Sequence, residues 1–319
     1  MNTNQIPLLV IGGPTGVGKT ELSINLAKRF NGEIINGDSL QVYRHLDIGT
    51  GKITKKEMEE IPHHLLDILD VDEDYDASQF KEAADEVILD IYKRGRLPIV
   101  VGGTGLYLSG LLYNLEFGGE GSHNVEIRAK YEEKLKQVGK QALWEVLLKK
   151  DPKAAAKIPY QNSRRVIRAL EVIQITGEKF SDQESHRVKK SVYNELLLVL
   201  DRPRSELYNR INQRVLQMIK MGLESEARWL YEISQSNEYQ SIKGIGYKEW
   251  WPYFEGDISI DNVIEKIQQN SRRYAKRQLT WFRNRMKEPH WIDVSNKHES
   301  LKTAEMLVET HLVNKKEDN

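Results

Sequence analysis

The chain carries, close to its first residue, the sequence Gly13-Pro14-Thr15-Gly16-Val17-Gly18-Lys19-Thr20. This sequence fits G-x-x-x-x-G-K-[ST], the phosphate-binding P-loop, in which backbone N–H groups, a helix N-terminus and a lysine surround an anion. The apolar run at 7–11 predicts a buried strand before the loop, and the run at 21–27 predicts a helix after it. We therefore predict a site for a diphosphate or triphosphate, with Thr20 as a ligand of Mg²⁺.

The composition excludes several classes of protein. The 319 residues include no cysteine, which excludes disulfides, thiolate zinc sites and cysteine nucleophiles and fits a reducing cytoplasm. No apolar run approaches the roughly 18 to 20 residues of a membrane span, and residues 1–5 do not resemble a signal peptide. Lys and Arg total 47, as do Asp and Glu, so only the distribution of charge can indicate a nucleic-acid partner. We expect a cytoplasmic monomer with no membrane partner.

Strands and helices alternate over the first third of the chain. Apolar runs at 33–36 and 97–101 predict two further strands, and an amphipathic run at 79–93 predicts a helix. This alternation predicts the α/β class, with a P-loop NTPase-like parallel sheet flanked by helices. Ligands of such sheets bind beyond the carboxyl ends of the strands. Since the P-loop, Asp38 and Thr104 follow three of these strands, we expect them to meet in one crevice.

The pattern changes near residue 115. A glycine-rich stretch at 117–122 resembles a linker, and we predict that 115–190 form an all-helical insertion in a core made of 1–114 and 191–319. Helix caps support this prediction, with Asn124 and Asn162 as N-caps and Gly139 and Gly177 as helix stops. The predicted helices of the insertion span 124–138, 141–149 and 162–176. In the rest of the core we predict strands at 195–201 and 290–294 and helices at 205–221, 261–287 and near 299–313.

Two segments at predicted strand ends carry candidate catalytic residues. Asp38 is followed by Ser39 and Gln41, which add further donors and acceptors. A carboxylate facing a phosphate site can hold Mg²⁺ or accept a proton from a nucleophile, although an aspartate here can also cap the next turn. The second segment is Gly102-Gly103-Thr104-Gly105, where a kinase or GTPase often has a magnesium-binding aspartate. Its glycines argue against ATP hydrolysis and favour close approach to a ligand, although simple chain reversal also gives this pattern.

Cations form three groups. Arg210 and Arg214 lie four apart on a predicted helix and suit a leaving diphosphate, although such a pair is usually only solvated. Residues 271–287 of the predicted helix 261–287 include seven cations and no acid, and Arg164 and Arg165 lie on the insertion together with Arg168. Two basic surfaces beside an anion site suggest a nucleic-acid acceptor, although a run of charge is more often merely solvated. His63 and His64 are adjacent and without a visible third ligand, so we interpret them as structural.

These segments together resemble the bacterial tRNA dimethylallyltransferases, also called tRNA isopentenyltransferases, over nearly the whole chain. Because the sequence contains no cysteine, we expect none of the zinc-finger extension of the eukaryotic relatives. The motifs that carry the resemblance begin with Gly12–Thr20 and continue in order with Asp38–Tyr43, Gly49–Lys52, Ile61–Leu65, Gly102–Tyr107, Gln161–Arg165, Gly244–Tyr247 and Tyr274–Phe282.

The resemblance implies transfer of a dimethylallyl group from its diphosphate to the exocyclic amine of the adenosine just 3′ of the anticodon, in tRNAs that read codons beginning with U. It also implies that the insertion contacts the anticodon stem-loop, whose single-stranded bases can be splayed into a channel. The tRNA contacts that we expect are Asp38, Ser39, Leu40, Gln41, Thr104, Arg128, Gln161, Asn162, Ser163, Arg164, Arg165, Arg272, Arg273, Lys276 and Arg277.

Given this reaction, the catalytic roles follow from chemistry. We expect Asp38 to accept a hydrogen bond or proton from the amine and to aim it at the allylic carbon, with Thr104 orienting the amine or the diphosphate. The P-loop amides, Lys19, a magnesium ion on Thr20, and either Arg210 or Arg214 would stabilise the charge on the leaving diphosphate.

Two other functions share some of these features. A kinase of a nucleoside or small molecule would use the same P-loop, sheet and Mg²⁺ with ATP. A non-catalytic RNA-binding or ATP-switch protein would explain the basic surfaces but not Asp38 facing a phosphate site. The isoprenyl donor and ATP are distinguished by which label reaches the acceptor.

Overall fold

The computed structural model describes residues 6–115, 124–185, 191–234 and 239–317. The chain divides into two compact units. The larger unit comprises residues 1–114 and 191–319, and the smaller comprises 115–190. Across the described part of the chain, no helix combines the length and the apolar character needed to cross a membrane.

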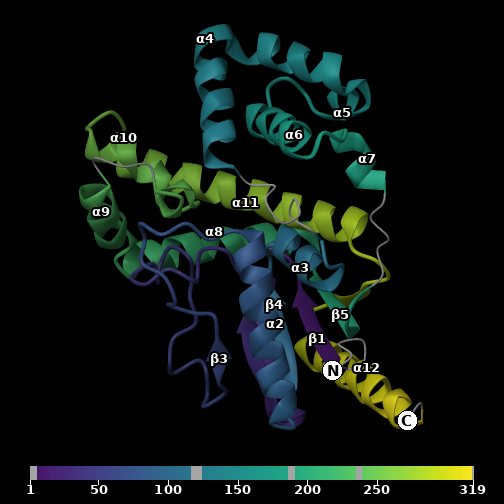
Figure 1. The fold of residues 1–319 in the computed structure, drawn as a ribbon. Helices are drawn as coiled ribbons and strands as arrows, with labels where there is room; N and C mark the ends of the chain where they lie inside the picture. Colours follow the sequence, from purple (N-terminus) through teal and green to yellow (C-terminus); the bar gives the residue numbers. More distant parts are fainter. Residues whose placement is uncertain (1–5, 116–123, 186–190, 235–238, 318–319) are drawn as a thin grey trace. The chain divides into compact units, whose positions relative to one another are not determined.

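A parallel sheet forms the centre of the larger unit (Figure 1). Among the described residues it has six strands in the order β3-β2-β4-β1-β5-β6, and all pairs are parallel. This arrangement confirms the predicted α/β class, and it places β1, which leads into the P-loop, inside the sheet. The strands are β1 Pro7–Gly12, β2 Gly32–Asn36, β3 His63–His64, β4 Leu97–Gly102, β5 Asn194–Asp201 and β6 His290–Asp293.

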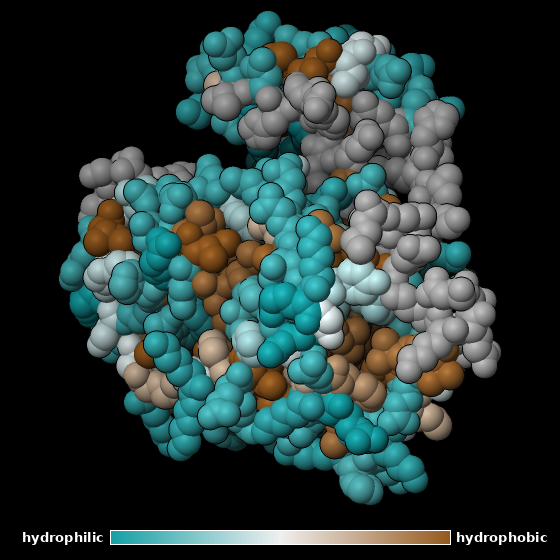
Figure 2. Space-filling model, turned by 60° about the horizontal axis from the view of Figure 1, so that its bottom comes forward, coloured by the Kyte–Doolittle hydropathy of each residue, from teal (hydrophilic) through white to brown (hydrophobic). Residues whose placement is uncertain are grey.

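Helices cover both faces of the sheet because successive strand side chains point to opposite faces. Leu9 and Ile11 of β1 share a buried cluster with Leu26 of α1 (Lys19–Arg29) and Val308 of α12 (Lys297–Glu317). On the other face, α2 (Ala77–Lys93) contacts β2 and β4 and packs against α3 (Gly105–Leu112). Hydrophilic residues cover most of the molecular face drawn in Figure 2, with hydrophobic residues in groups between them.

The carboxyl-terminal half of the larger unit adds helices, two of which border the site. Helix α8 (Arg204–Lys220) packs against α11 (Ile260–Arg285), close to the predicted positions. The segment 223–254 had no predicted element, yet the structure has helices there. They are α9 Leu223–Ile233, η2 Ser241–Lys243, η3 Lys248–Trp250 and α10 Trp251–Phe254.

The smaller unit is helical, with its own core around Leu143, Leu147 and Leu170. The side chains of Asn124 and Asn162 accept hydrogen bonds from backbone N–H groups three residues ahead, which confirms both predicted N-caps. Gly139, with a φ of 79°, breaks α4 where a stop was predicted. The helices are α4 Val125–Lys150, α5 Pro152–Lys157, α6 Ser163–Thr176 and α7 Phe180–Ser185, and the predicted linker at 117–122 lies outside the described residues.

Candidate functional site

The P-loop connects β1 to α1, as the motif requires. Gly16 and Gly18 have φ values of 77° and 116°, in the left-handed region that favours glycine. Gly18 is the N-cap of α1, which begins at Lys19, so the loop ends at a helix N-terminus with unpaired N–H groups. Such a terminus attracts anions through its N–H groups and its dipole.

Lys19 is held inside the curve of the loop. Its Nζ donates hydrogen bonds to the carbonyl oxygens of Gly13, at 3.0 Å, and Pro14, at 2.9 Å. Burial lowers the pKa of Lys19 to about 8, against the opposing effect of the Asp38 carboxylate. The ammonium is therefore fixed at the loop, where it can pair with a phosphate.

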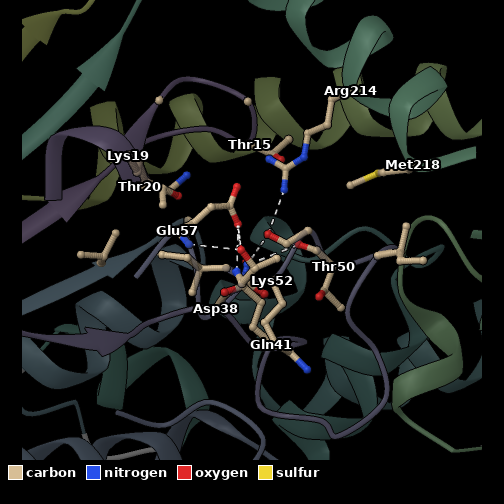
Figure 3. A pocket seen from close by; sticks show the side chains of 18 of the residues that line it. Thr15, Lys19, Thr20, Asp38, Gln41, Thr50, Lys52, Glu57, Arg214 and Met218 are labelled. Carbon is tan, nitrogen blue, oxygen red and sulfur yellow. Dashed lines mark hydrogen bonds between the residues drawn. The ribbon is translucent and has the colours of Figure 1, made fainter. Parts of the chain in front are cut away.

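A cavity of about 600 Å³ opens beside the P-loop in the larger unit. Figure 3 shows side chains of the P-loop, Asp38 and Arg214 around this space, with the segment 50–57 on another side. The polar residues that line it include Thr15, Lys19, Thr20, Asp38, Gln41, Thr50, Lys52, Glu57, Arg210, Arg214 and Gln278.

Asp38 caps a turn and also lines the cavity. Its Oδ1 accepts a hydrogen bond from the Leu40 N–H at 3.0 Å, so it caps a turn. It also lines the cavity and lies close enough to raise the pKa values of Lys19 and Arg214 through its negative charge. The Thr104 hydroxyl accepts a hydrogen bond from the Ser39 N–H at 3.3 Å, which joins the ends of β2 and β4. The three strand ends therefore lie together as expected, although Thr104 itself lines neither cavity.

Arg210 and Arg214 of α8 have different surroundings. Arg210 is exposed, and its Nε donates to the Gly16 carbonyl at 3.0 Å, so it contacts the P-loop itself. Arg214 is partly buried, and its Nη2 donates to the Gly51 carbonyl at 3.2 Å. Burial lowers the pKa of Arg214, while Asp38 and Glu57 raise it. Both side chains reach the cavity, and Arg214 faces the Asp38 carboxylate across it.

A second cavity of about 350 Å³ adjoins the first. Thr15, Asp38, Thr50, Arg214 and Met218 line both cavities, so Asp38 stands where they meet. The second cavity has a different wall, formed by apolar side chains, the segment 243–246 and α11. Its further lining residues include Ser39, Leu40, Ile211, Val215, Ile245, Ile267, Tyr274 and Arg277.

The basic residues of α11 begin at this second cavity. The Arg277 guanidinium packs over the Tyr274 ring at 5.6 Å, and both residues line the cavity. Arg273 and Lys276 are exposed, whereas Arg272 is partly buried and donates a hydrogen bond to the Asn212 side chain. The helix therefore presents cations to solvent beside a cavity that contains Asp38.

The remaining predicted tRNA contacts lie in the smaller unit. Asn162 and Ser163 form the start of α6, and the Asn162 side chain is engaged as its N-cap. Gln161 and Arg164 are exposed, and Arg165 and Arg128 are partly exposed. Gln161–Arg165 thus form one polar group at a helix start, with Arg128 on the neighbouring helix α4.

Gln278 was not among the predicted site residues. Its Oε1 accepts a hydrogen bond from the Thr15 N–H at 2.9 Å, and its Nε2 donates to the Gly103 carbonyl at 3.0 Å. This buried side chain therefore joins the P-loop to the turn before Thr104. A signal was available in the sequence, because helical spacing places Gln278 on the buried face with Ala275 and Phe282, where a polar residue needs partners.

The adjacent histidines have structural partners, in line with their predicted role. His63 Nδ1 lies 2.8 Å from the Ile61 carbonyl, and His64 Nε2 lies 2.7 Å from the Glu33 carboxylate. No group of three or more His, Cys, Asp or Glu side chains suited to a metal ion occurs within the described ranges.

Comparison with known proteins places this site in context. The family model described as IPP transferase matches residues 41–285. The tRNA dimethylallyltransferase of Latilactobacillus sakei is 50% identical over 281 residues, which cover 88% of this chain and 89% of that protein. The protein of the same name from Macrococcus caseolyticus is 48% identical over 293 residues, with 92% of each chain covered.

Solved structures agree with these sequence relatives. The full-length tRNA isopentenylpyrophosphate transferase of Bacillus halodurans superposes with a TM-score of 0.74 at 43% identity, over 98% of both chains. A eukaryotic dimethylallyltransferase acting on tRNA gives a TM-score of 0.80 at 33% identity, over 92% of this chain and 75% of the other. With a P-loop site, a shared fold and relatives of this identity over most of its length, the chain belongs to the IPP transferase family.

Proposed function

We propose that this protein transfers a dimethylallyl group from dimethylallyl diphosphate to the exocyclic amine of the adenosine 3′-adjacent to the anticodon, in tRNAs that read codons beginning with U. The observation that carries the proposal is Asp38 at the junction of two cavities, one bounded by the P-loop and the other by α11. The names of the relatives support it, since they specify a dimethylallyl group and tRNA.

The acceptor amine is a weak nucleophile because its lone pair is delocalised into the adenine ring. Asp38 accepts a hydrogen bond or the proton from this amine and aims it at the allylic carbon. Thr104, which lines neither cavity itself, would help to orient the base through its hydrogen bond with the Ser39 N–H. The carbon–oxygen bond to the diphosphate breaks as the nitrogen–carbon bond forms, and negative charge gathers on the leaving group. The P-loop amides, Lys19 and Arg214, which line the cavity, would stabilise that charge, and Arg210 would support the loop through its hydrogen bond to the Gly16 carbonyl.

The donor set at the cavity fits a magnesium ion. Magnesium keeps several waters and binds few protein groups when a substrate supplies phosphate oxygens, so a large carboxylate cluster is not required. The Thr20 hydroxyl would hold the ion, with the Asp38 and Glu57 carboxylates lining the same cavity. Bound there with the diphosphate, the ion would neutralise charge on the leaving group.

The smaller unit and α11 supply the groups for tRNA. Exposed Gln161 and Arg164, with Arg165 and Arg128, would contact the anticodon stem-loop, and Arg273, Lys276 and Arg277 would pair with phosphates near the extruded base. Tyr274, beside Arg277 in the second cavity, offers a ring against which a base can stack. A kinase shares the P-loop but does not need a basic, aromatic cavity of this kind.

The decisive experiment is single-turnover transfer with two labelled donors. Unmodified bulk tRNA and Mg²⁺ are incubated with the protein and either radiolabelled dimethylallyl diphosphate or γ-labelled ATP. We expect label to enter tRNA from the isoprenyl donor alone, at an adenosine beside the anticodon. Transfer from ATP alone, or no label on tRNA from either donor, would overturn the proposal.

A further inference from the structure

A single carboxylate on α9 holds one wall of the first cavity. Glu226 Oε2 accepts hydrogen bonds from the N–H groups of Asp47, at 3.0 Å, and Ile48, at 2.8 Å. Its Oε1 accepts from the Gly49 N–H at 2.8 Å and from the Tyr247 hydroxyl at 2.7 Å. Hydrogen bonds to a charged acceptor are about twice as strong as neutral ones, so this carboxylate is a strong anchor for the segment 47–49.

The anchored segment leads directly to Arg214. Two residues after Gly49, the Gly51 carbonyl accepts the hydrogen bond from Arg214 Nη2 at 3.2 Å, as the dashed line in Figure 3 shows. A Cβ on Gly51 would lie 1.6 Å from the same nitrogen, so the guanidinium rests against the backbone of this segment. The position of residues 47–51 therefore determines where the Arg214 guanidinium lies.

Tyr247 fixes the same segment from a second direction. A Cβ on Gly49 would lie 2.5 Å from the Tyr247 ring, so the ring packs directly on the backbone there. Tyr247 is buried, and both burial and the Glu226 charge raise the pKa of its hydroxyl, which therefore remains a donor to Glu226. Its loop, 244–247, supplies part of the second cavity, so the Glu226 carboxylate links walls of both cavities.

We propose that Glu226 is a positioning residue for the transfer reaction, one that acts through residues 47–51 to hold Arg214 against the diphosphate. This inference rests on the proposed function and deepens it. Glu226 lines neither cavity, so it has no direct route to substrate. Displacement of a charge-stabilising group by as little as an ångström can cost a large factor in rate, which makes such an anchor important for activity.

A double-mutant cycle tests this route. Magnesium pyrophosphate binding is measured by calorimetry for the wild type, Glu226→Gln, Arg214→Gln and the double variant. Glu226→Gln keeps the shape but replaces one acceptor oxygen with a donor that faces N–H or O–H groups. We expect it to weaken pyrophosphate affinity about tenfold, and kcat/KM for dimethylallyl diphosphate in parallel. In the Arg214→Gln background the same change should have no further effect.

Matched variants separate this role from general destabilisation. Glu224→Gln removes a surface ion pair with Arg228 on the same helix and should change affinity less than about twofold. If Glu226→Gln does not fold, as judged by circular dichroism, Tyr247→Phe removes one of the four hydrogen bonds and keeps the ring. We expect Tyr247→Phe to weaken pyrophosphate affinity about threefold, and to have no effect in the Arg214→Gln background.

Two outcomes would overturn the inference. One is an unchanged pyrophosphate affinity in Glu226→Gln, and the other is a double variant whose loss of affinity equals the product of the two single losses. Multiplied losses would mean that Glu226 acts independently of Arg214. The same wild-type preparation is assayed for transfer to tRNA. Absence of transfer there would overturn the proposed function, whereas the pyrophosphate cycle reports on the anchor alone.

Discussion

Asp38 has one carboxylate oxygen engaged in its own turn and lies at the junction of the two cavities. Asp38→Asn retains an oxygen for the Leu40 N–H but cannot accept a proton, and we expect transfer to slow about a hundredfold or more. The affinity for tRNA should change little. Single-turnover rates and filter binding test this expectation, and near-normal turnover would remove Asp38 from the catalytic role.

Lys19 gives the donor site a dependence on pH. Its pKa of about 8 means that the ammonium is charged at pH 7 and loses its proton as the pH rises through 8. A bound diphosphate favours the charged form, so pyrophosphate affinity should fall about tenfold between pH 7 and pH 9. Lys19→Arg stays charged throughout this range and should bind with a flat profile. A wild-type profile equally flat would contradict the assigned pKa.

At this scale, sequence reasoning found the residue types but not all of their partners. The motif was enough to locate Lys19 and Thr20, since the P-loop is a local structure. The spacing of Arg210 and Arg214 placed both on one helix but could not separate them, because their difference comes from contacts with Gly16 and Gly51. Those contacts join segments that are far apart in the chain.

Among the elements, α11 combines a buried face with a basic exposed one. Replacing both Arg273 and Arg277 with Gln should weaken tRNA binding and reduce the slope of log K against log salt by about 0.7 to 0.9 for each phosphate that the helix no longer neutralises. Arg283→Gln is the matched control, since Arg283 lies on the same helix but pairs with Asp201. Filter binding of tRNA at several salt concentrations measures this slope. An unchanged slope of log K against log salt would mean that these cations contact no phosphate.

Most long elements with strong periodicity were predicted to within a few residues, whereas the amphipathic helix α9 and the short elements were missed. Helix α11 was predicted at 261–287 and spans Ile260–Arg285, because its apolar face repeats regularly. Strand β3 has only two residues, His63 and His64, and exists through its pairing with β2. A strand of that length has no pattern of its own, and neither do the single turns η2 and η3.

At the scale of the whole molecule, the Glu33 carboxylate on strand β2 makes the free energy of unfolding depend on pH in the acid range. This buried carboxylate of β2 pairs with Arg94, and hydrogen bonds from Arg94 and His64 lower its pKa to about 2 despite burial. A lowered pKa stabilises the fold above about pH 4.5, and that stabilisation is lost as the pH falls toward 2. We expect Glu33→Gln to cost about 2 kcal/mol at pH 6, after allowance for the exposure of Arg94, and roughly half of that or less at pH 3.

Urea unfolding at both pH values measures this difference. Glu59→Gln serves as the control, because Glu59 pairs with Lys28 at the surface and should cost less than about 1 kcal/mol at either pH. A cost for Glu33→Gln that does not change with pH would contradict the assigned pKa.

The alternation of strands and helices indicated the sheet, and the change of pattern near 115 coincides with a boundary between the two units. The hydrogen bonds that join the parts of the site could not be predicted from the sequence. They depend on pairs such as Thr15 and Gln278, which are 263 positions apart. Local patterns carry no information about such pairs, which form only when the tertiary structure brings them together.

That separation along the chain has a consequence for synthesis on the ribosome. The P-loop is made well before β5, which pairs with β1, and before Gln278, which accepts a hydrogen bond from Thr15. Until α11 has been translated, the nascent chain contains the phosphate-binding motif but lacks the Gln278 side chain, which accepts a hydrogen bond from the loop at Thr15. The protein therefore completes its site only after α11 has been made, and a truncated product that ends before Gln278 carries the motif without a finished cavity.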